Sequence, residues 1–323
     1  MDQTKNTSAR FDKGLKLDIE KIGLEISDQL SKLTEMSDNF YHYTSAQGIQ
    51  GIIENRVMWA TDIRFLNDLS EFDNGMVIII DRMLKHKNPI IAELSKLLKT
   101  YYSQTMDSAT PYVTSFCIEK DLLSQWRAYA NNASGYCMEF DFSKTKFKVA
   151  GQDVDSWVKG KPIIYDDEEK KTIVDNSLDE LEQLLIKYKV DETYLIEQGS
   201  IGTLAGYVSA SMFMLACHFK DKSFKEEKEW RVCFILNQSQ AEQIREFRIS
   251  DGGFIPYIPV SFNQKENENE EQIPIPLVSV CLPPSSGINA EKGLRLLLND
   301  YTLNNVLVNK SNIPLKNKAS LHW

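Results

Sequence analysis

Short strand-like runs alternate with helix-length amphipathic segments along most of the chain. Residues 40–44 and 112–117 are rich in aromatic and β-branched side chains, whereas residues 46–53 carry isoleucines at helical spacing. The alternation continues to a last expected strand at residues 305–308, and no internal repeat or Gly/Ser-rich linker interrupts it. This pattern predicts an α+β fold with one mixed core.

The ends and one insertion differ from this pattern. An apolar stripe near the N-terminus predicts an amphipathic helix, packed on its own domain or against a partner or a second copy. Residues 263–272 have no apolar side chain, which predicts a solvated acidic loop. We therefore expect an N-terminal helical extension over residues 1–38 and a single domain over residues 39–323. The stripe consists of Leu15, Ile19, Ile22, Ile26, Leu30 and Leu33.

Charge and cysteine spacing exclude several classes of protein. The formal net charge is −9 without a long basic run, which argues against a surface for a nucleic-acid backbone and leaves nucleic acid only as an acceptor. The five cysteines are far apart and lack CxxC spacing, so neither a disulfide framework nor a zinc site is indicated. The N-terminus lacks a signal-like apolar region, and the apolar stretch at residues 201–216 is too short to span a bilayer. These features predict a cytoplasmic protein with no membrane contact and no metal.

Widespread catalytic signatures are absent: the sequence has no GxGxxG, P-loop, HExxH or GxSxG motif. One short constellation lies on the first expected strand. His42 and Thr44 fall on one face because strand side chains alternate, and Tyr41 and Tyr43 fall on the other. A histidine here can donate to a ribose hydroxyl or a phosphate, or it can be a satisfied structural residue.

A second constellation is the aromatic pair Trp126 and Tyr129, three residues apart on an expected helix. The pair can form a wall for a flat nicotinamide or adenine ring, and it can equally be core packing.

A third constellation combines acids with an arginine. In an extended segment, Glu227, Glu229 and Arg231 project from one side, and aromatic and aliphatic residues project from the other. Arg231 should help to keep a neighbouring carboxylate ionised. The alternative is an ion-pair ladder on the surface of a sheet.

The order of these groups resembles the bacterial family called domain of unknown function 2971, from about residue 40 to residue 314. That family name implies no activity. The residues that carry the resemblance are His42-Tyr-Thr44, Asn67-Asp68 with Glu71, Ser115-Phe116, Ser124-x-Trp126-x-x-Tyr129 with Gly135, and Glu227-x-Glu229-Trp-Arg231.

The same order is similar to the His-Tyr-Glu branch of the ADP-ribosyltransferase superfamily, which implies a split mixed or antiparallel β core flanked by helices. By this resemblance His42 binds the NAD ribose, Tyr129 stacks on nicotinamide, and Glu229 hydrogen-bonds the ribose hydroxyl. Glu227 can share or exchange duties with Glu229. The stacking aromatic can instead be Tyr112, Tyr136 or Trp126. Further expected NAD contacts are Thr44, Tyr43, Ser115, Trp126, Arg64 and Asn67.

The resemblance implies an enzyme that uses NAD as a co-substrate and needs no metal. It would cleave the bond between nicotinamide and ribose and transfer ADP-ribose to an unknown macromolecular or small-molecule acceptor, as a bacterial toxin or an anti-phage defence effector. The alternative is a non-catalytic module on the same fold that binds a nucleotide or a protein. An RNA 2′-phosphotransferase is less favoured because paired Arg and His residues for an RNA phosphate are scarce.

Overall fold

A computed structural model describes most of the chain after the N-terminal segment. The expected N-terminal helix, the acidic loop at residues 263–272 and Asn67 lie outside the described residues. The described residues are 39–66, 71–105, 109–142, 147–149, 152–153, 161–187, 189–191, 201–250, 253–262, 275–284 and 286–314.

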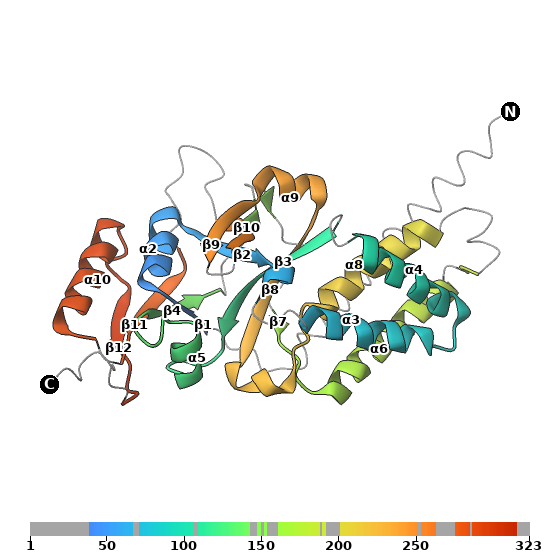
Figure 1. Cartoon of the computed structure of the whole chain (residues 1–323), viewed down its shortest axis with the longest axis horizontal. Coiled ribbons are helices and arrows are strands. Elements are labelled where there is room, and N and C mark those ends of the chain that lie inside the picture. Colours follow the sequence, from blue (N-terminus) through green and yellow to red (C-terminus); the bar gives the residue numbers. More distant parts are fainter. Residues whose placement is uncertain are drawn as a thin grey trace.

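The fold is mixed α+β, as the alternating pattern predicts (Figure 1). The strands are β1 (Asn39–Thr44), β2 (Val57–Asp62), β3 (Ala109–Cys117), β4 (Tyr136–Asp141), β5 (Phe147–Val149), β6 (Gln152–Asp153), β7 (Lys161–Pro162), β8 (Glu229–Asn237), β9 (Glu246–Ser250), β10 (Gly253–Phe262), β11 (Leu277–Leu282) and β12 (Leu307–Lys310). The helices are α2 (Ala46–Asn55), α3 (Glu71–Leu84), α4 (Pro89–Thr105), α5 (Leu123–Ala128), α6 (Asp167–Lys187), α8 (Ile201–Ala216), α9 (Gln238–Ile244) and α10 (Ile288–Asp300), with short 3₁₀ turns η1 (Ile63–Phe65) and η2 (Lys222–Glu227).

Strand β3 is the centre of the sheet. Its whole length pairs with β8, from Ala109 opposite Asn237 to Cys117 opposite Glu229. Both β1 and β2 also pair with β3, β1 at Cys117 and β2 at Tyr112 and Val113. Since a strand has only two edges, β1 and β2 share the edge that β8 leaves free. The sheet therefore divides between β1 and β2 along this edge.

Each half of the divided sheet continues on its own side. Beyond β1 lie β4, β11 and β12, and beyond β2 lies β10, which also pairs with β5 and β9. Among the described pairings of named strands, β11 with β12 is parallel and the others are antiparallel. The sheet is therefore mixed, as the sequence predicts.

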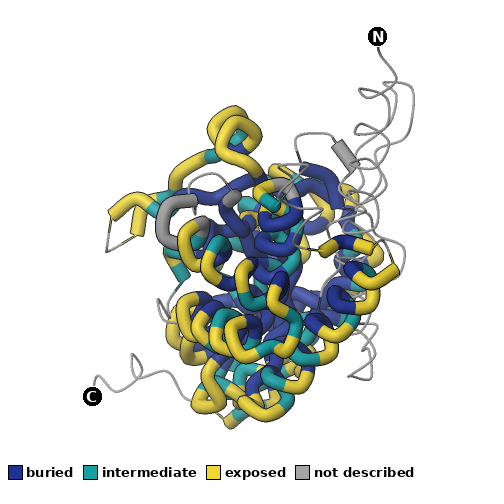
Figure 2. The backbone as a smooth tube through the Cα atoms, turned by 90° about the vertical axis from the view of Figure 1, so that its right-hand side faces the viewer, coloured by how far each residue is buried: buried dark blue, intermediate teal, exposed yellow. Residues whose placement is uncertain are grey.

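Two large apolar clusters cover the two faces of the sheet. Val113 and Cys233 point into one cluster with α3, α4, α6 and α8. Tyr112 and Trp230 point into the other cluster with α2, α9 and α10. The four helices of the first cluster gather at one end of the molecule (Figure 1), where Figure 2 shows buried turns on the inside and exposed turns outside. Within the described residues, no helix is both long and apolar enough to cross a membrane.

Local chemistry sets the helix boundaries. In the helical pattern of residues 71–102, Asn88-Pro89 predicts a break. This is confirmed, because α3 ends at Leu84 and α4 begins at Pro89, where the Asn88 side chain accepts a hydrogen bond from the Ile90 amide at 3.0 Å. Apolar spacing predicts a further helix over residues 177–188, and this start is wrong. The helix α6 begins at Asp167, because the Asp166 carboxylate accepts hydrogen bonds from the amides of Glu168 and Glu169, a capping signal that apolar periodicity does not contain.

Gly135 lies where the backbone turns into β4. A Cβ atom at this position would lie 2.1 Å from the carbonyl oxygen of Thr44 and 3.0 Å from that of Ala130. Both obstacles are backbone atoms that cannot rotate away. The close approach of these segments therefore requires glycine at position 135.

We predict that Gly135→Ala lowers the free energy of unfolding by about 1–3 kcal/mol, because the added methyl group must displace backbone. Gly51→Ala is the matched control. A Cβ at Gly51 meets nothing within 4 Å, and alanine in the interior of α2 should add up to about 1 kcal/mol. Urea unfolding measures both changes. Equal stability of Gly135→Ala and the wild type would contradict the predicted clash.

Candidate functional site

A buried network of charges joins the sheet to the helical end of the molecule. Arg231 projects from β8, and its side chain is 2% exposed. Its Nε donates to Glu229 Oε1 at 2.5 Å and its Nη2 to Glu71 Oε2 at 2.6 Å, while its Nη1 donates to the Cys217 carbonyl at 3.0 Å. The guanidinium thus holds together β8, the start of α3 and the end of α8.

Lys220 is the second cation of the network. Its Nζ lies 3.0 Å from Glu71, 2.6 Å from Glu227 and 2.9 Å from Glu229. Burial alone would lower the pKa of this amine, but the carboxylates of Glu229, Glu71 and Glu227 together raise it above its usual value. Lys220 therefore stays charged and binds three carboxylates at one point.

Glu229 accepts four hydrogen bonds within the network. Oε1 accepts from Ser115 Oγ at 2.6 Å and from Arg231 Nε, and Oε2 accepts from Lys220 and, at 3.1 Å, from Arg231 Nη2. Burial opposes the charge of the carboxylate, but Arg231 and Lys220 overcome it and lower the pKa to about 2. The prediction that Arg231 keeps a carboxylate ionised agrees with this environment, although the network is buried and is not a surface ladder.

Glu227 lies at the outer edge of the network, and its side chain is 14% exposed. Oε2 accepts from Lys220, and Oε1 accepts from the Tyr129 hydroxyl at 2.9 Å. Burial and the charge of Glu227 raise the pKa of Tyr129, so the phenol stays protonated and donates. Each carboxylate oxygen of Glu227 accepts one hydrogen bond and can accept another. Each oxygen of Glu229 already accepts two.

The backbone carries Glu227 to this position by an unexpected route. The sequence predicts that Glu227 and Glu229 are equivalent positions of one extended segment. Instead Glu227 ends the 3₁₀ turn η2, and Lys228 follows in the left-handed region with φ of 47°. The strand begins only at Glu229, which shares a face with Arg231 as predicted.

Ser115 of β3 connects two residues that the sequence analysis places in one site. Its hydroxyl donates to Glu229, and its carbonyl oxygen lies 3.1 Å from His42 Nδ1. Because Tyr41, Cys117 and Glu229 are in register across three strands, His42 points to the opposite face of the sheet. There its ring packs edge-on against Phe116. His42 and Glu229 therefore flank β3 and do not line one surface.

Several expected cofactor contacts are core or local structural residues. Trp126 is 0% exposed, donates to Asp121 and packs at 89° against the buried ring of Tyr43, so neither aromatic ring faces a ligand. Of the two alternatives for the Trp126–Tyr129 pair, Trp126 follows core packing, and the pair forms no shared wall because α5 ends at Ala128 and Tyr129 turns toward Glu227. Arg64 is bound to Asp62 through two nitrogens, and Thr44 lies against the first turn of α2 at Gly48.

Sequence reasoning missed Lys220 and Glu71 as members of the network. Glu71 appears in the family pattern only as a matching residue, and Lys220 lies among other charged residues before η2. Sequence reasoning also missed Tyr165, whose hydroxyl oxygen accepts a hydrogen bond from the Glu229 backbone amide at 2.9 Å. Their contacts join residues far apart in the chain, which a local pattern does not contain.

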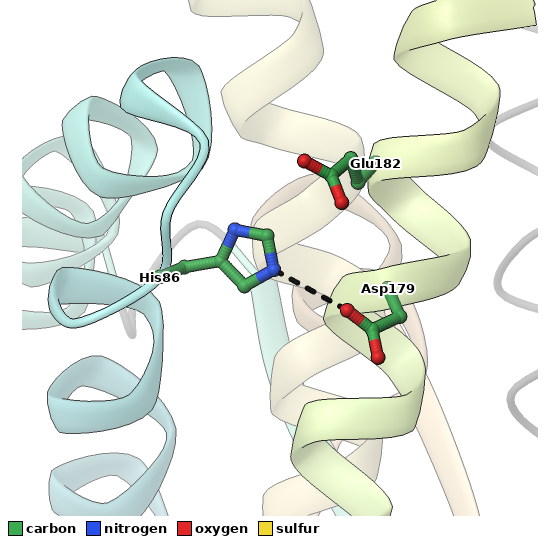
Figure 3. A group of neighbouring side chains, drawn as sticks. All are labelled: His86, Asp179 and Glu182. Atoms are coloured by element: carbon green, nitrogen blue, oxygen red, sulfur yellow. Dashed lines mark ion pairs between the residues drawn. The ribbon is translucent and has the colours of Figure 1, made fainter.

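One other group of side chains has the composition of a metal site among the described residues. His86, Asp179 and Glu182 have ligand atoms within 4.8 Å of one another, and His86 Nε2 points toward Asp179 (Figure 3). However, His86 Nδ1 accepts from the Asn88 amide at 3.1 Å, so the proton of the neutral ring lies on Nε2. Lys87 already binds Glu182 at 3.0 Å. We therefore interpret the group as a polar contact between α6 and the α3–α4 turn, and the sequence prediction of no metal remains a prediction.

Residues 125–232 match the family model described as protein of unknown function (DUF2971). This confirms the resemblance to that family over α5 to β8, a shorter stretch than the sequence analysis expects. The matched stretch contains Tyr129, Lys220, Glu227, Glu229 and Arg231. Neither a curated protein nor a solved structure matches the chain.

The pKa of Glu229 predicts an acid-sensitive contribution to stability. Because this pKa is about 2 in the folded protein against an ordinary 4.5, the contribution is fully present above pH 4.5 and is lost as the pH falls toward 2. Its size is about 3 kcal/mol. Urea unfolding should therefore show that the stability difference between the wild type and Glu229→Gln shrinks from pH 6 to pH 2. Glu291→Gln, on the exposed face of α10, is the control. If the free energies of unfolding of the wild type and Glu229→Gln fell in parallel between pH 6 and pH 2, the lowered pKa of Glu229 could not be the cause of acid sensitivity.

Proposed function

We propose that the protein is an ADP-ribosyltransferase-like enzyme that consumes NAD, with Glu227 and Tyr129 at the reacting end of the site. The observation that carries the proposal is the position of Glu227. This carboxylate stands at the edge of a buried charged network, ionic bonds to Lys220 hold it in place, and it retains acceptor capacity on both oxygens. A substrate hydroxyl at this edge can be bound without breaking the network.

The arrangement suits cleavage of the bond between nicotinamide and ribose. The bond from ribose C1′ to the nicotinamide nitrogen breaks, and its electron pair leaves with nicotinamide. The acceptor then forms a bond to C1′ and gives up a proton. Positive charge develops on the ribose before the new bond is complete, and a fixed carboxylate stabilises that charge by electrostatic preorganisation.

The two acids have different roles in this proposal. Glu229, whose oxygens are occupied by Ser115, Arg231 and Lys220, fixes the cations in place. Glu227 contacts the nicotinamide ribose, and Tyr129 orients the Glu227 carboxylate through its hydroxyl. This exchanges the roles that the family resemblance implies, in which Glu229 holds the ribose. The acceptor can be a macromolecule, a small molecule or water.

A second candidate function is a module that binds a nucleotide or a protein segment without chemistry. The observation that favours it is the completeness of the network, in which Glu229 accepts four hydrogen bonds within the protein. Such networks can be structural. Calorimetry that finds NAD binding with no release of nicotinamide would favour this alternative.

The proposed chemistry predicts that Glu227→Gln lowers the rate of nicotinamide release from NAD by roughly 10²–10³-fold, because a preorganised contact to the developing charge is removed. Release is measured by chromatography with purified protein, in the presence and absence of a bacterial cell extract as the source of acceptor. Glu226→Gln is the matched control, since Glu226 is an exposed neighbour with no hydrogen bond to Lys220. Tyr129→Phe should give a smaller loss. Equal rates for the wild type and Glu227→Gln, or no release by the wild type with any extract, would count against the enzyme.

A further inference from the structure

Arg248, on β9, is a half-buried cation whose bonding capacity is mostly unused. Its Nε is buried and has no hydrogen-bond partner, and its Nη2 makes one long contact of 3.4 Å to Thr61 Oγ1. Within the part of the chain that the structure describes, no carboxylate lies within ion-pair distance of it. A planar guanidinium with free donors is the side chain that best matches the geometry of a phosphate or carboxylate.

The electrostatic surroundings of Arg248 are deficient in negative charge. Burial lowers the pKa of the guanidinium, and only the Tyr257 phenol acts against this. An anion bound at Arg248 would supply the missing opposite charge and stabilise the charged guanidinium.

Arg248, Thr61 and Trp59 lie on one face of the half of the sheet that begins at β2. Thr61 is opposite Val113 of β3 and Tyr257 of β10, and Tyr257 shares a face with Arg248 through the pairing of β10 with β9. Because paired residues share a face, this is the face of the sheet that also carries Glu229. Arg248 reaches both Thr61 and Trp59 from β9.

An aromatic surface adjoins Arg248. The Trp59 ring is 45% exposed, which is unusual for tryptophan, and the buried Tyr257 supports it at a centroid distance of 4.5 Å. The guanidinium carbon of Arg248 lies 6.0 Å from the Trp59 ring centroid. A flat, half-exposed indole next to an unsatisfied guanidinium offers stacking for a base and hydrogen bonds for the phosphate attached to it.

We propose that Arg248, Thr61 and Trp59 form a subsite for the phosphates and base of an adenine nucleotide. This inference rests on the proposed function and deepens it, because it assigns the ADP half of NAD to the part of the Glu229 face that β2 and β9 carry. Arg248 binds the diphosphate, Thr61 donates to its oxygens, and Trp59 stacks on adenine. Inorganic phosphate compounds carry the same kind of charge but have no base. Dependence of binding on the Trp59 ring therefore distinguishes an adenine nucleotide from inorganic phosphate as the ligand.

Isothermal titration of the full chain with ADP and with inorganic pyrophosphate tests the subsite. Arg248→Gln should weaken binding of both probes at least tenfold. Trp59→Ala should weaken binding of ADP at least tenfold and leave pyrophosphate within twofold of the wild type. Arg295→Gln, which removes an exposed arginine of α10, is the matched control and should bind both probes as the wild type does. Thermal unfolding of each variant establishes that it is folded.

A second arginine variant protects the test against a folding defect. Arg248→Lys keeps the charge but loses the forked geometry, and we expect it to bind ADP three- to tenfold more weakly than the wild type. A wild type that binds neither probe, or full ADP binding by both Arg248 variants, would overturn the subsite. Nicotinamide release by a wild type that binds no ADP would overturn this inference and leave the proposed enzyme standing. Loss of ADP binding in Arg248→Gln, with no nicotinamide release by the wild type, would support the subsite and count against catalysis.

Discussion

The ion pair between Arg231 and Glu229 is the interaction on which the centre of the molecule depends. Both side chains are withdrawn from water, and each is stabilised by a further opposite charge, Glu71 for the arginine and Lys220 for the carboxylate. Loss of one partner would leave a buried charge uncompensated, which costs about 3–5 kcal/mol in comparable networks. The pair therefore fixes the positions of β8, α3 and the segment after α8 relative to one another.

This constraint also separates charge along one face of the sheet. Where that face meets the helical end, three carboxylates surround two cations, and the excess acid, Glu227, is at the outside. Farther along the same face, Arg248 lies in a region poor in acid among the described residues. NAD has a cationic ring at one end and a diphosphate in the middle. Under the proposed function, the charge distribution would orient such a ligand before any specific contact forms.

The parts of this structure that sequence patterns predict are those governed by local periodicity. The strand at β8 has Glu229 and Arg231 on one face and Trp230 on the other because side chains alternate along any strand. The break before Pro89 follows from the missing amide proton of proline. The expected α+β class is correct for the same reason, since short alternating runs and helical stripes are properties of neighbouring residues.

The candidate site was less predictable because its geometry depends on breaks in that periodicity. The left-handed residue Lys228 separates Glu227 from the strand, and the end of α5 separates Tyr129 from Trp126. Because indole rings suit flat ligands, the sequence favours Trp126 as a ligand contact, but its ring is enclosed and its nitrogen donates to Asp121. Lys220 carries no local signal, since its importance comes from three acids that tertiary folding brings to it.

The shared edge of β3 has a consequence for how the chain reaches this fold. The contact between Ser115 and Glu229 closes a loop of 114 residues, and β3 must also receive β1 and β2, which are synthesised before it. Among the described strands, the two halves of the sheet are joined only through β3. Neither half alone therefore defines the register of the other. Contacts of such long range form slowly, and β3 has its complete set of neighbours only after β8 has emerged. Folding of the centre is therefore a late, cooperative event, in which the same strand pairing that completes the sheet also assembles the charged network.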